Sequence, residues 1–277
     1  PVTAADAIPA NRRPLAVGLM GSGIGFGILF ISTVSGRLRD SMGDAAWVDV
    51  YQVQFYIGVV VMLLVFLLVR HQQTKPSGGG GIGGFSALQR MPGWFPLTLA
   101  YGCFGFMYLL ILGFLTTRLE DDSGWTSVDA SVAFSILGVA MIFGGPVLTT
   151  LAQRLGVRRI LSVAFGLWPV FTVILLSGIT LPVWLACVGI GFLFSSLPSL
   201  ITLYVVENTT TEDYGASFAA ATLVFGIAQT ISPPIGGWIA DTAGSFTLVF
   251  LLSAATSLVG LVATLRLPRT VGLLKAE

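Results

Sequence analysis

The chain has 277 residues, of which 55% are hydrophobic and only 10% are charged. Soluble domains carry about 25% charged residues, so this composition excludes a soluble fold. The net charge of +1 also excludes a partner such as nucleic acid, which needs a basic surface. Cys103 and Cys187 lie in apolar runs, and the single histidine, His71, lies in a polar loop. The sequence therefore predicts no cluster of metal ligands, and we expect no cofactor.

Eight apolar segments are long enough to cross a bilayer, which takes about 20 helical residues. In chain order they are expected near residues 14–36, 51–69, 94–117, 128–150, 160–179, 182–205, 215–238 and 246–266. We therefore predict an all-α polytopic membrane protein with eight transmembrane helices. The chain begins at Pro1 without a charged start, a short apolar core and a cleavage site, so we do not expect a secretory precursor.

The first segment contains a glycine-rich run, "GLMGSGIGFGILF", at residues 18–30. The run matches neither G-x-G-x-x-G nor the phosphate loop G-x-x-x-x-G-K-[ST], so it does not predict a nucleotide site. Gly21 and Gly25 are four residues apart, as are Gly23 and Gly27. Small residues at this spacing line one helix face and let two membrane helices approach closely. We predict that Gly21 and Gly25 pack against a neighbouring helix.

The longest connection, residues 70–93, contains a run of glycines that is typical of a flexible linker. It divides the chain into residues 1–69 with two spans, the linker 70–93, and residues 94–277 with six spans.

The basic residues of the loops predict the orientation in the membrane. With the N-terminus inside, the outer segments hold only Arg37, Arg39 and Arg118. The inner segments hold Arg12, Arg13, Arg70, Lys75, Arg90, Arg154, Arg158, Arg159, Arg266, Arg269 and Lys275. We therefore expect both ends of the chain in the cytoplasm. The expected location is the plasma membrane, which in bacteria is the inner membrane.

Two segments match at an offset of 201 residues: "GRLRDSMG" at 36–43 and "GWIADTAG" at 237–244. Both read G-x-x-x-D-x-x-G, and both lie at the outer end of a span. Because the first span pairs with the seventh, the predicted repeat unit is six helices. A protein of six plus six helices would lack its first four helices in this chain.

Three motifs resemble the major facilitator superfamily. The loop "TTLAQRLGVRR" after the fourth span is similar to the family signature G-x-L-A-D-R-x-G-R-R between helices 8 and 9. Ala152, Arg154, Gly156 and Arg158 match the signature, whereas Thr149, Gln153 and Val157 depart from it. "PPIGGWIADTAGS" is similar to the end of helix 11. "NRRPLAVGLMGSGIG" resembles the start of helix 5 in the monocarboxylate-carrier-like branch.

The resemblance implies two six-helix bundles joined by a long cytoplasmic loop, with the linker 70–93 in its place. The chain would then hold helices 5–12, and helices 7, 10 and 11 would border a central cavity. In the family, the aspartate that Gln153 replaces helps to latch the cytoplasmic gate. The glycine-lined helix 5 would pack smoothly against its neighbour and permit sliding and rocking.

Ionisable residues inside a membrane span are functional candidates by default, but here they lie only in loops and at span ends. If the protein binds an anion, Arg118 or helices outside this chain must supply the charge. This absence argues against a carboxylate substrate but not against transport.

Uncharged polar and aromatic groups are the remaining candidates for the substrate pathway. In the seventh span Phe218, Thr222, Phe225 and Gln229 share one helix face. An amide in lipid costs several kcal/mol, so Gln229 must face protein or a watery cavity. The predicted pathway residues are Gln229, Tyr101, Tyr108, Phe104, Thr222, Phe225, Ser195 and Ser199. The alternative is that the hydroxyls bond to their own backbone and the aromatic rings fill the core.

Gating is predicted at Arg154, Gly156, Arg158 and Asp241. The arginines are equally explained as positive-inside anchors, and Asp241 as a cap or gate contact at the outer face. Prolines inside the spans remove backbone hydrogen bonds and are expected to kink their helices. These are Pro146, Pro169, Pro198, Pro233 and Pro234.

The sequence thus predicts a secondary active or facilitative transporter of a small organic solute, with carboxylates among the candidates, that works by alternating access. Coupling to an ion stays open, and the full-length protein is expected to be a monomer in the bilayer. The alternative is a non-transporting polytopic protein that acts as an assembly or sensory partner. An enzyme is not expected, because no catalytic groups converge within the spans.

Overall fold

The computed structural model describes residues 13–68 and 83–268, and every regular element in these ranges is helical. The elements are α2 (Arg13–Met42), η2 (Gly43–Ala46), α3 (Trp47–Leu68), α4 (Gly83–Arg90), α5 (Trp94–Leu112), α6 (Leu115–Asp121), α7 (Ser127–Leu155), α8 (Val157–Leu175), α9 (Thr180–Asn208), α10 (Thr211–Ala243) and α11 (Thr247–Leu265). The all-α prediction is confirmed.

The predicted spans correspond to long helices. Seven helical segments of the described chain are long and apolar enough to cross a membrane, with α5 and α6 counted together as Trp94–Asp121. The first predicted span, 14–36, lies in α2, a helix of 30 residues that is not one of these seven, so seven of the eight predicted spans have such a helix. The matching segments 36–43 and 237–244 both end at a glycine with positive φ, 63° at Gly43 and 66° at Gly244. Each glycine follows the last residue of a long helix, where this conformation stops helical hydrogen bonding.

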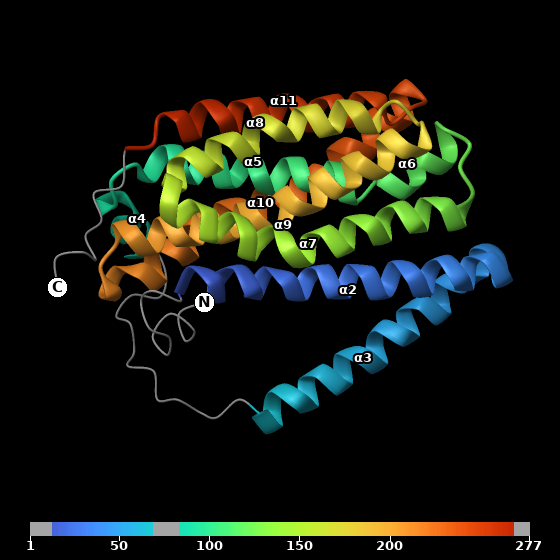
Figure 1. Ribbon diagram of the computed structural model, residues 1–277, viewed down its shortest axis with the longest axis horizontal. Coiled ribbons are helices and arrows are strands. Elements are labelled where there is room, and N and C mark those ends of the chain that lie inside the picture. Colours follow the sequence, from blue (N-terminus) through green and yellow to red (C-terminus); the bar gives the residue numbers. More distant parts are fainter. Residues whose placement is uncertain (1–12, 69–82, 269–277) are drawn as a thin grey trace.

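The most buried helix is α9, with 78% of its apolar window inside the protein, whereas the corresponding value for α3 is 0%. In Figure 1, α2 lies along one edge of the bundle and α8 and α11 lie along the opposite edge, with α5, α9 and α10 between them. Rings such as Phe104, Phe165, Trp168 and Phe250 fill the core among these helices. After η2, α3 runs back obliquely away from the bundle (Figure 1), and all its residues remain exposed or half-buried.

Glycines bring α2 and α7 together backbone to backbone. A Cβ on Gly25 would lie 2.7 Å from the carbonyl oxygen of Gly138, and one on Gly138 would lie 2.8 Å from the backbone nitrogen of Leu29. A Cβ on Gly145 would similarly lie 2.6 Å from the carbonyl oxygen of Gly18. We call Gly18, Gly25, Gly138 and Gly145 the glycine seam. Because a methyl group has no room at these points, only glycine permits the observed separation of the two helices.

Gly21 lies on the same buried side of α2 but meets α9, where a Cβ would lie 3.1 Å from the carbonyl oxygen of Ser195. Gly23 and Gly27 lie on the opposite side, where they are exposed, and within the described chain no atom lies close enough to limit a Cβ there. The two glycine pairs with equal spacing therefore have different surroundings.

The glycine run of the predicted linker falls outside the described residues. The part of the linker at Gly83–Arg90 forms α4, which packs on α10. Ala87 and Leu88 are buried there, and Arg90 donates to Asp213 through Nε at 3.2 Å and Nη2 at 2.7 Å. This hydrogen bond raises the pKa of the Arg90 guanidinium above its ordinary value.

Candidate functional site

Aromatic rings from three helices form one stacked group between α5, α9 and α10. The ring of Phe225 lies 4.6 Å from that of Tyr101, 5.8 Å from Phe104 and 5.9 Å from Tyr108, in stacked geometry each time. Phe194 of α9 closes the group at 5.0 Å from Tyr108. We call these five residues the aromatic cluster. Offset ring pairs at such distances contribute about 0.5–1.5 kcal/mol each beyond the area that they bury.

The cluster depends on a close approach of α10 to α5 at one glycine. A Cβ on Gly105 would lie 2.6 Å from the carbonyl oxygen of Phe225. Ser232 fixes the same pair of helices further along, because its hydroxyl donates to the carbonyl oxygen of Phe106 at 2.6 Å. The three α5 rings are almost fully buried, whereas Phe225 is half-buried. The cluster therefore has a closed side on α5 and an open side on α10.

The open side of α10 carries the predicted polar residues. Thr222 and Gln229 are both half-buried. The Thr222 hydroxyl donates to the carbonyl oxygen of Phe218 at 2.7 Å, as serines and threonines in membrane helices often do. The side-chain amide of Gln229 makes no hydrogen bond to another residue in the part of the chain that the structure describes. Its amide therefore keeps its full hydrogen-bonding capacity for a ligand or water.

Two prolines inside the helices have a serine partner on a neighbouring helix. Pro146 has no N–H for the carbonyl oxygen of Ile142, and the Ser22 hydroxyl of α2 donates to that oxygen at 2.5 Å. Each such serine supplies the donor that the proline lacks, so the helix continues without an unsatisfied carbonyl.

The same arrangement recurs in α8. Pro169 leaves the carbonyl oxygen of Phe165 without its usual donor, and the Ser257 hydroxyl of α11 donates to it at 2.6 Å. Sequence reasoning placed the prolines but missed both serines, because the partner lies on a helix far away in the chain.

Pro198 and Pro233 lack such a partner. They remove the usual donors of the carbonyl oxygens of Phe194 and Gln229, respectively. Among the described residues, no side chain donates to either oxygen. Phe194 belongs to the aromatic cluster, and Gln229 lies on the open side of α10. The aromatic cluster and the open side of α10 thus offer backbone carbonyl oxygens as hydrogen-bond acceptors, in addition to the rings and the side-chain amide of Gln229.

Ser195 and Ser199 lie elsewhere, where α2, α7 and α9 meet. The backbone N–H of Gly145 donates to Ser195 Oγ at 2.9 Å, and the Ser199 hydroxyl donates to the carbonyl oxygen of Ser195 at 2.9 Å. Both serines are buried. The structure therefore separates them from the aromatic cluster, with which the other predicted pathway residues lie.

The residues considered for gating lie at the helix ends. Gly156 has a φ of 91° and separates α7 from α8. Arg158 donates to the carbonyl oxygen of Leu265 at 2.5 Å, which places its charge at the negative C-terminal end of α11. Arg154 and Asp241 are exposed.

Arg118 is buried and engaged within the protein. Its Nη2 donates to the carbonyl oxygen of Leu176 at 2.8 Å, and its Nη1 donates to Ser123 at 3.2 Å. The guanidinium carbon lies 5.7 Å from the centre of the Phe250 ring. These contacts hold Arg118 between α6, α8 and α11, away from the aromatic cluster.

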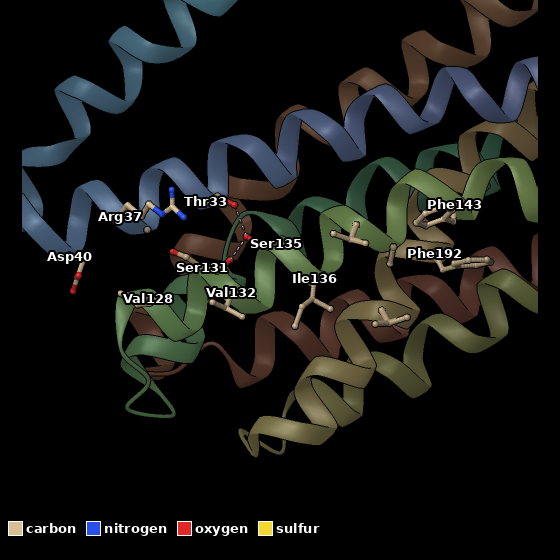
Figure 2. Close-up of a pocket in the computed structure, with 14 residues that line it drawn as sticks. Thr33, Arg37, Asp40, Val128, Ser131, Val132, Ser135, Ile136, Phe143 and Phe192 are labelled. Carbon is tan, nitrogen blue, oxygen red and sulfur yellow. Dashed lines mark hydrogen bonds between the residues drawn. The ribbon is translucent and has the colours of Figure 1, made fainter.

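A separate cavity of about 710 Å³ lies between α2, α7 and α9 (Figure 2). Its lining includes Arg37 and Asp40 at the end where α2 finishes, and Phe143 and Phe192 at the other end. None of the residues of the aromatic cluster lines it.

Comparison with known proteins finds membrane transporters. The model of a family described as "Uncharacterised MFS-type transporter YbfB" matches residues 3–265. The chain is similar to raffinose permease of Escherichia coli, with 27% identity over 177 residues that cover 56% of this chain and 41% of the permease. It is also similar to monocarboxylate transporter 12 of Rattus norvegicus, with 26% identity over 56% of this chain and 32% of that protein. The chain spans less than half of the length of the curated relatives that it matches.

Among solved structures, the fold resembles that of the Escherichia coli fucose:proton symporter FucP. The TM-score is 0.68 at 18% identity, and the match covers 95% of this chain and 71% of the symporter. A second structure of FucP, in the outward conformation, matches with a TM-score of 0.65 at 19% identity over 95% of this chain and 70% of that one. At these identities the likeness concerns the fold alone.

Proposed function

We propose that this chain, which belongs to the MFS-type transporter family whose model matches residues 3–265, takes part in membrane transport. The chain forms part of a secondary active or facilitative transporter in the plasma membrane, which moves a small organic solute by alternating access. Both ends of the chain lie in the cytoplasm, as the distribution of Lys and Arg predicts.

The substrate pathway runs along the open side of α10. The observation that carries this assignment is the half-buried amide of Gln229, which has no hydrogen-bond partner among the described residues, on the same helix as Phe225 of the aromatic cluster. Thr222 precedes Phe225 by one helical turn on the same face. An amide, a hydroxyl and ring faces can together orient a small polar solute, because each polar group fixes one hydrogen bond and the rings exclude water.

The solute is uncharged and polar rather than anionic. Arg118, the buried cation nearest to this region in sequence, is already bonded to Leu176 and Ser123. The other cations of the described helices lie near helix ends, so we expect no cation beside Gln229 to balance the charge of an anion. Among the relatives, the name of raffinose permease favours an uncharged sugar, whereas the name of monocarboxylate transporter 12 favours a carboxylate.

The movement between the outward-open and inward-open states of alternating access takes place at the glycine seam and at Gly21. At the glycines no side chains interlock, so α2 can slide along α7 once the hydrogen bonds of Ser22 to Ile142 and of Ser32 to Ser135 break. Ser195 and Ser199 belong to this moving contact, and Arg154, Gly156, Arg158 and Asp241 control the two ends of the pathway.

Uptake assays in cells test the pathway. The probe solutes are raffinose for an uncharged sugar and lactate for a carboxylate. We expect the uptake of raffinose to fall at least tenfold in Gln229→Ala, although this variant reaches the membrane in normal amounts. Thr230→Ala is the matched control, because Thr230 is the exposed neighbour on the same helix. Unchanged uptake in Gln229→Ala would remove Gln229 from the pathway, and uptake of lactate alone would reverse the assignment of the substrate class.

A further inference from the structure

The cavity between α2, α7 and α9 has the shape and the lining of a binding groove. It extends along α7 from Val128 to Phe143, which corresponds to about 22 Å of helix. One leaflet of a bilayer, from its polar surface to its centre, measures about 20–22 Å. Figure 2 shows Arg37 and Asp40 at one end and Phe143 and Phe192 at the other. The groove therefore matches one leaflet in length, with its charges at the level of the lipid headgroups.

The walls of the groove face away from the protein core. Val132, Val139 and Phe143 of α7 are 40%, 41% and 57% exposed, and Val188 of α9 is 44% exposed. In a helix that spans a membrane, such outward apolar side chains meet hydrocarbon or the apolar face of another helix. A groove between them accepts a flexible apolar chain.

Two of the three hydroxyl side chains that line the groove are already bonded within the protein. Thr33 donates to the carbonyl oxygen of Leu29 at 2.8 Å, and Ser135 donates to the carbonyl oxygen of Ser131 at 2.8 Å. A polar solute would therefore find few partners along the walls, and the ligand that fits is apolar over most of its length.

The charged residues at the mouth are of both signs. Arg39, which lies between them in sequence, is held by Glu120 at 2.8 and 2.9 Å. Within the described ranges, neither Arg37 nor Asp40 takes part in an ion pair. A guanidinium matches a phosphate through two parallel hydrogen bonds, and a carboxylate three residues further along matches an ammonium group. Phosphate and ammonium together form the headgroup of a zwitterionic phospholipid.

We propose that this groove binds one phospholipid such as phosphatidylethanolamine. An acyl chain lies between α7 and α9, the phosphate contacts Arg37 and the ammonium group contacts Asp40. The lipid stands beside the contact of α2 with α7. The bound lipid therefore covers the side of the glycine seam that faces the bilayer.

Native mass spectrometry of the purified, delipidated chain tests the assignment. We expect one dioleoylphosphatidylethanolamine to bind at least five times more tightly than dioleoylphosphatidylglycerol, which has the same acyl chains but no ammonium group. Val132→Trp fills the groove and should weaken this binding at least tenfold, and Val139→Trp repeats the obstruction two turns deeper. Val170→Trp on α8 is the matched control, because Val170 is also exposed but does not line the groove.

Charge variants separate the headgroup from the acyl chain. Arg37→Gln should weaken binding of both lipids about fivefold, and Asp40→Asn should abolish the preference for phosphatidylethanolamine. Arg159→Gln, an exposed arginine at the opposite end of the helices, should change neither. Unchanged lipid binding in both groove variants would overturn the site. Loss of binding in the groove variants with no effect in Arg37→Gln would overturn the phospholipid in favour of a purely apolar ligand.

Discussion

The contact of α2 with α7 and the contact of α5 with α10 are both close, but they are built in opposite ways. The first consists of four glycines facing backbone, so little side-chain volume lies between the helices. The second has a single glycine, Gly105, and is surrounded by stacked rings that interlock around it. A smooth contact permits translation, whereas an interlocked contact fixes one arrangement. The difference fits the proposed function, in which α5 and α10 stay together while α2 shifts along α7.

Removing a ring from the interlocked contact is expected to have the largest effect. Phe104 is 1% exposed and stacks on Tyr108 at 5.2 Å and on Phe225. Phe104→Ala leaves a cavity and should lower the free energy of unfolding by about 3 kcal/mol, at the low end of the usual range because transfer from water contributes little inside a bilayer.

Thermal unfolding of the purified protein in detergent measures this loss. Phe143→Ala provides the control, because Phe143 is 57% exposed and lies outside the aromatic cluster. A melting temperature that falls equally in both variants would show that the aromatic cluster has no special role in holding α5 to α10.

Adding a methyl group to the smooth contact comes next in size. In Gly25→Ala the new Cβ lies 2.7 Å from the carbonyl oxygen of Gly138, so α2 and α7 must separate. Overpacking of this kind costs about 1–3 kcal/mol. Gly27→Ala is the matched control, because it lies half a turn away on the exposed side and should change stability by less than about 0.5 kcal/mol.

The same unfolding assay compares the two variants, and transport adds a second readout. If the seam is the moving contact, Gly25→Ala should reduce uptake more than its loss of stability explains, while Gly27→Ala transports normally. Equal behaviour of the two variants would contradict the assignment of the seam.

The glycine pairs show how far the sequence alone could lead. The spacing of Gly21 and Gly25 is the same as that of Gly23 and Gly27, so it predicts a packed face without deciding which face meets the neighbour. The all-α fold followed from hydrophobic run lengths, which are set by the thickness of the bilayer. Which helix lies next to a given glycine face depends on tertiary packing, and the sequence of that one helix does not determine it.

The candidate site shows the same division. Periodicity placed Tyr101 and Tyr108 on one helix face and Phe225 on a face of another helix, and in the structure these rings stack on each other. It missed Phe194, because no polar or periodic signal marks that ring on α9. It also grouped Ser195 with the rings, whereas this serine accepts a hydrogen bond from Gly145 on α7. A hydroxyl has the same appearance in the sequence whether its partner is a ligand or a neighbouring backbone.

The smallest expected effect concerns the serine that serves the seam. Ser22→Ala leaves the carbonyl oxygen of Ile142 with neither the N–H that Pro146 lacks nor the hydroxyl that replaces it. Hydrogen bonds between membrane helices contribute about 0.6 kcal/mol on average and at most about 1.7 kcal/mol. Ser257→Ala removes the equivalent bond at Phe165, but between α8 and α11, outside the seam. Both variants should lose similar stability. Only Ser22→Ala should change the rate of uptake, because its bond joins the two helices that move. Equal rates of uptake in the two variants would mean that α2 and α7 remain fixed during transport.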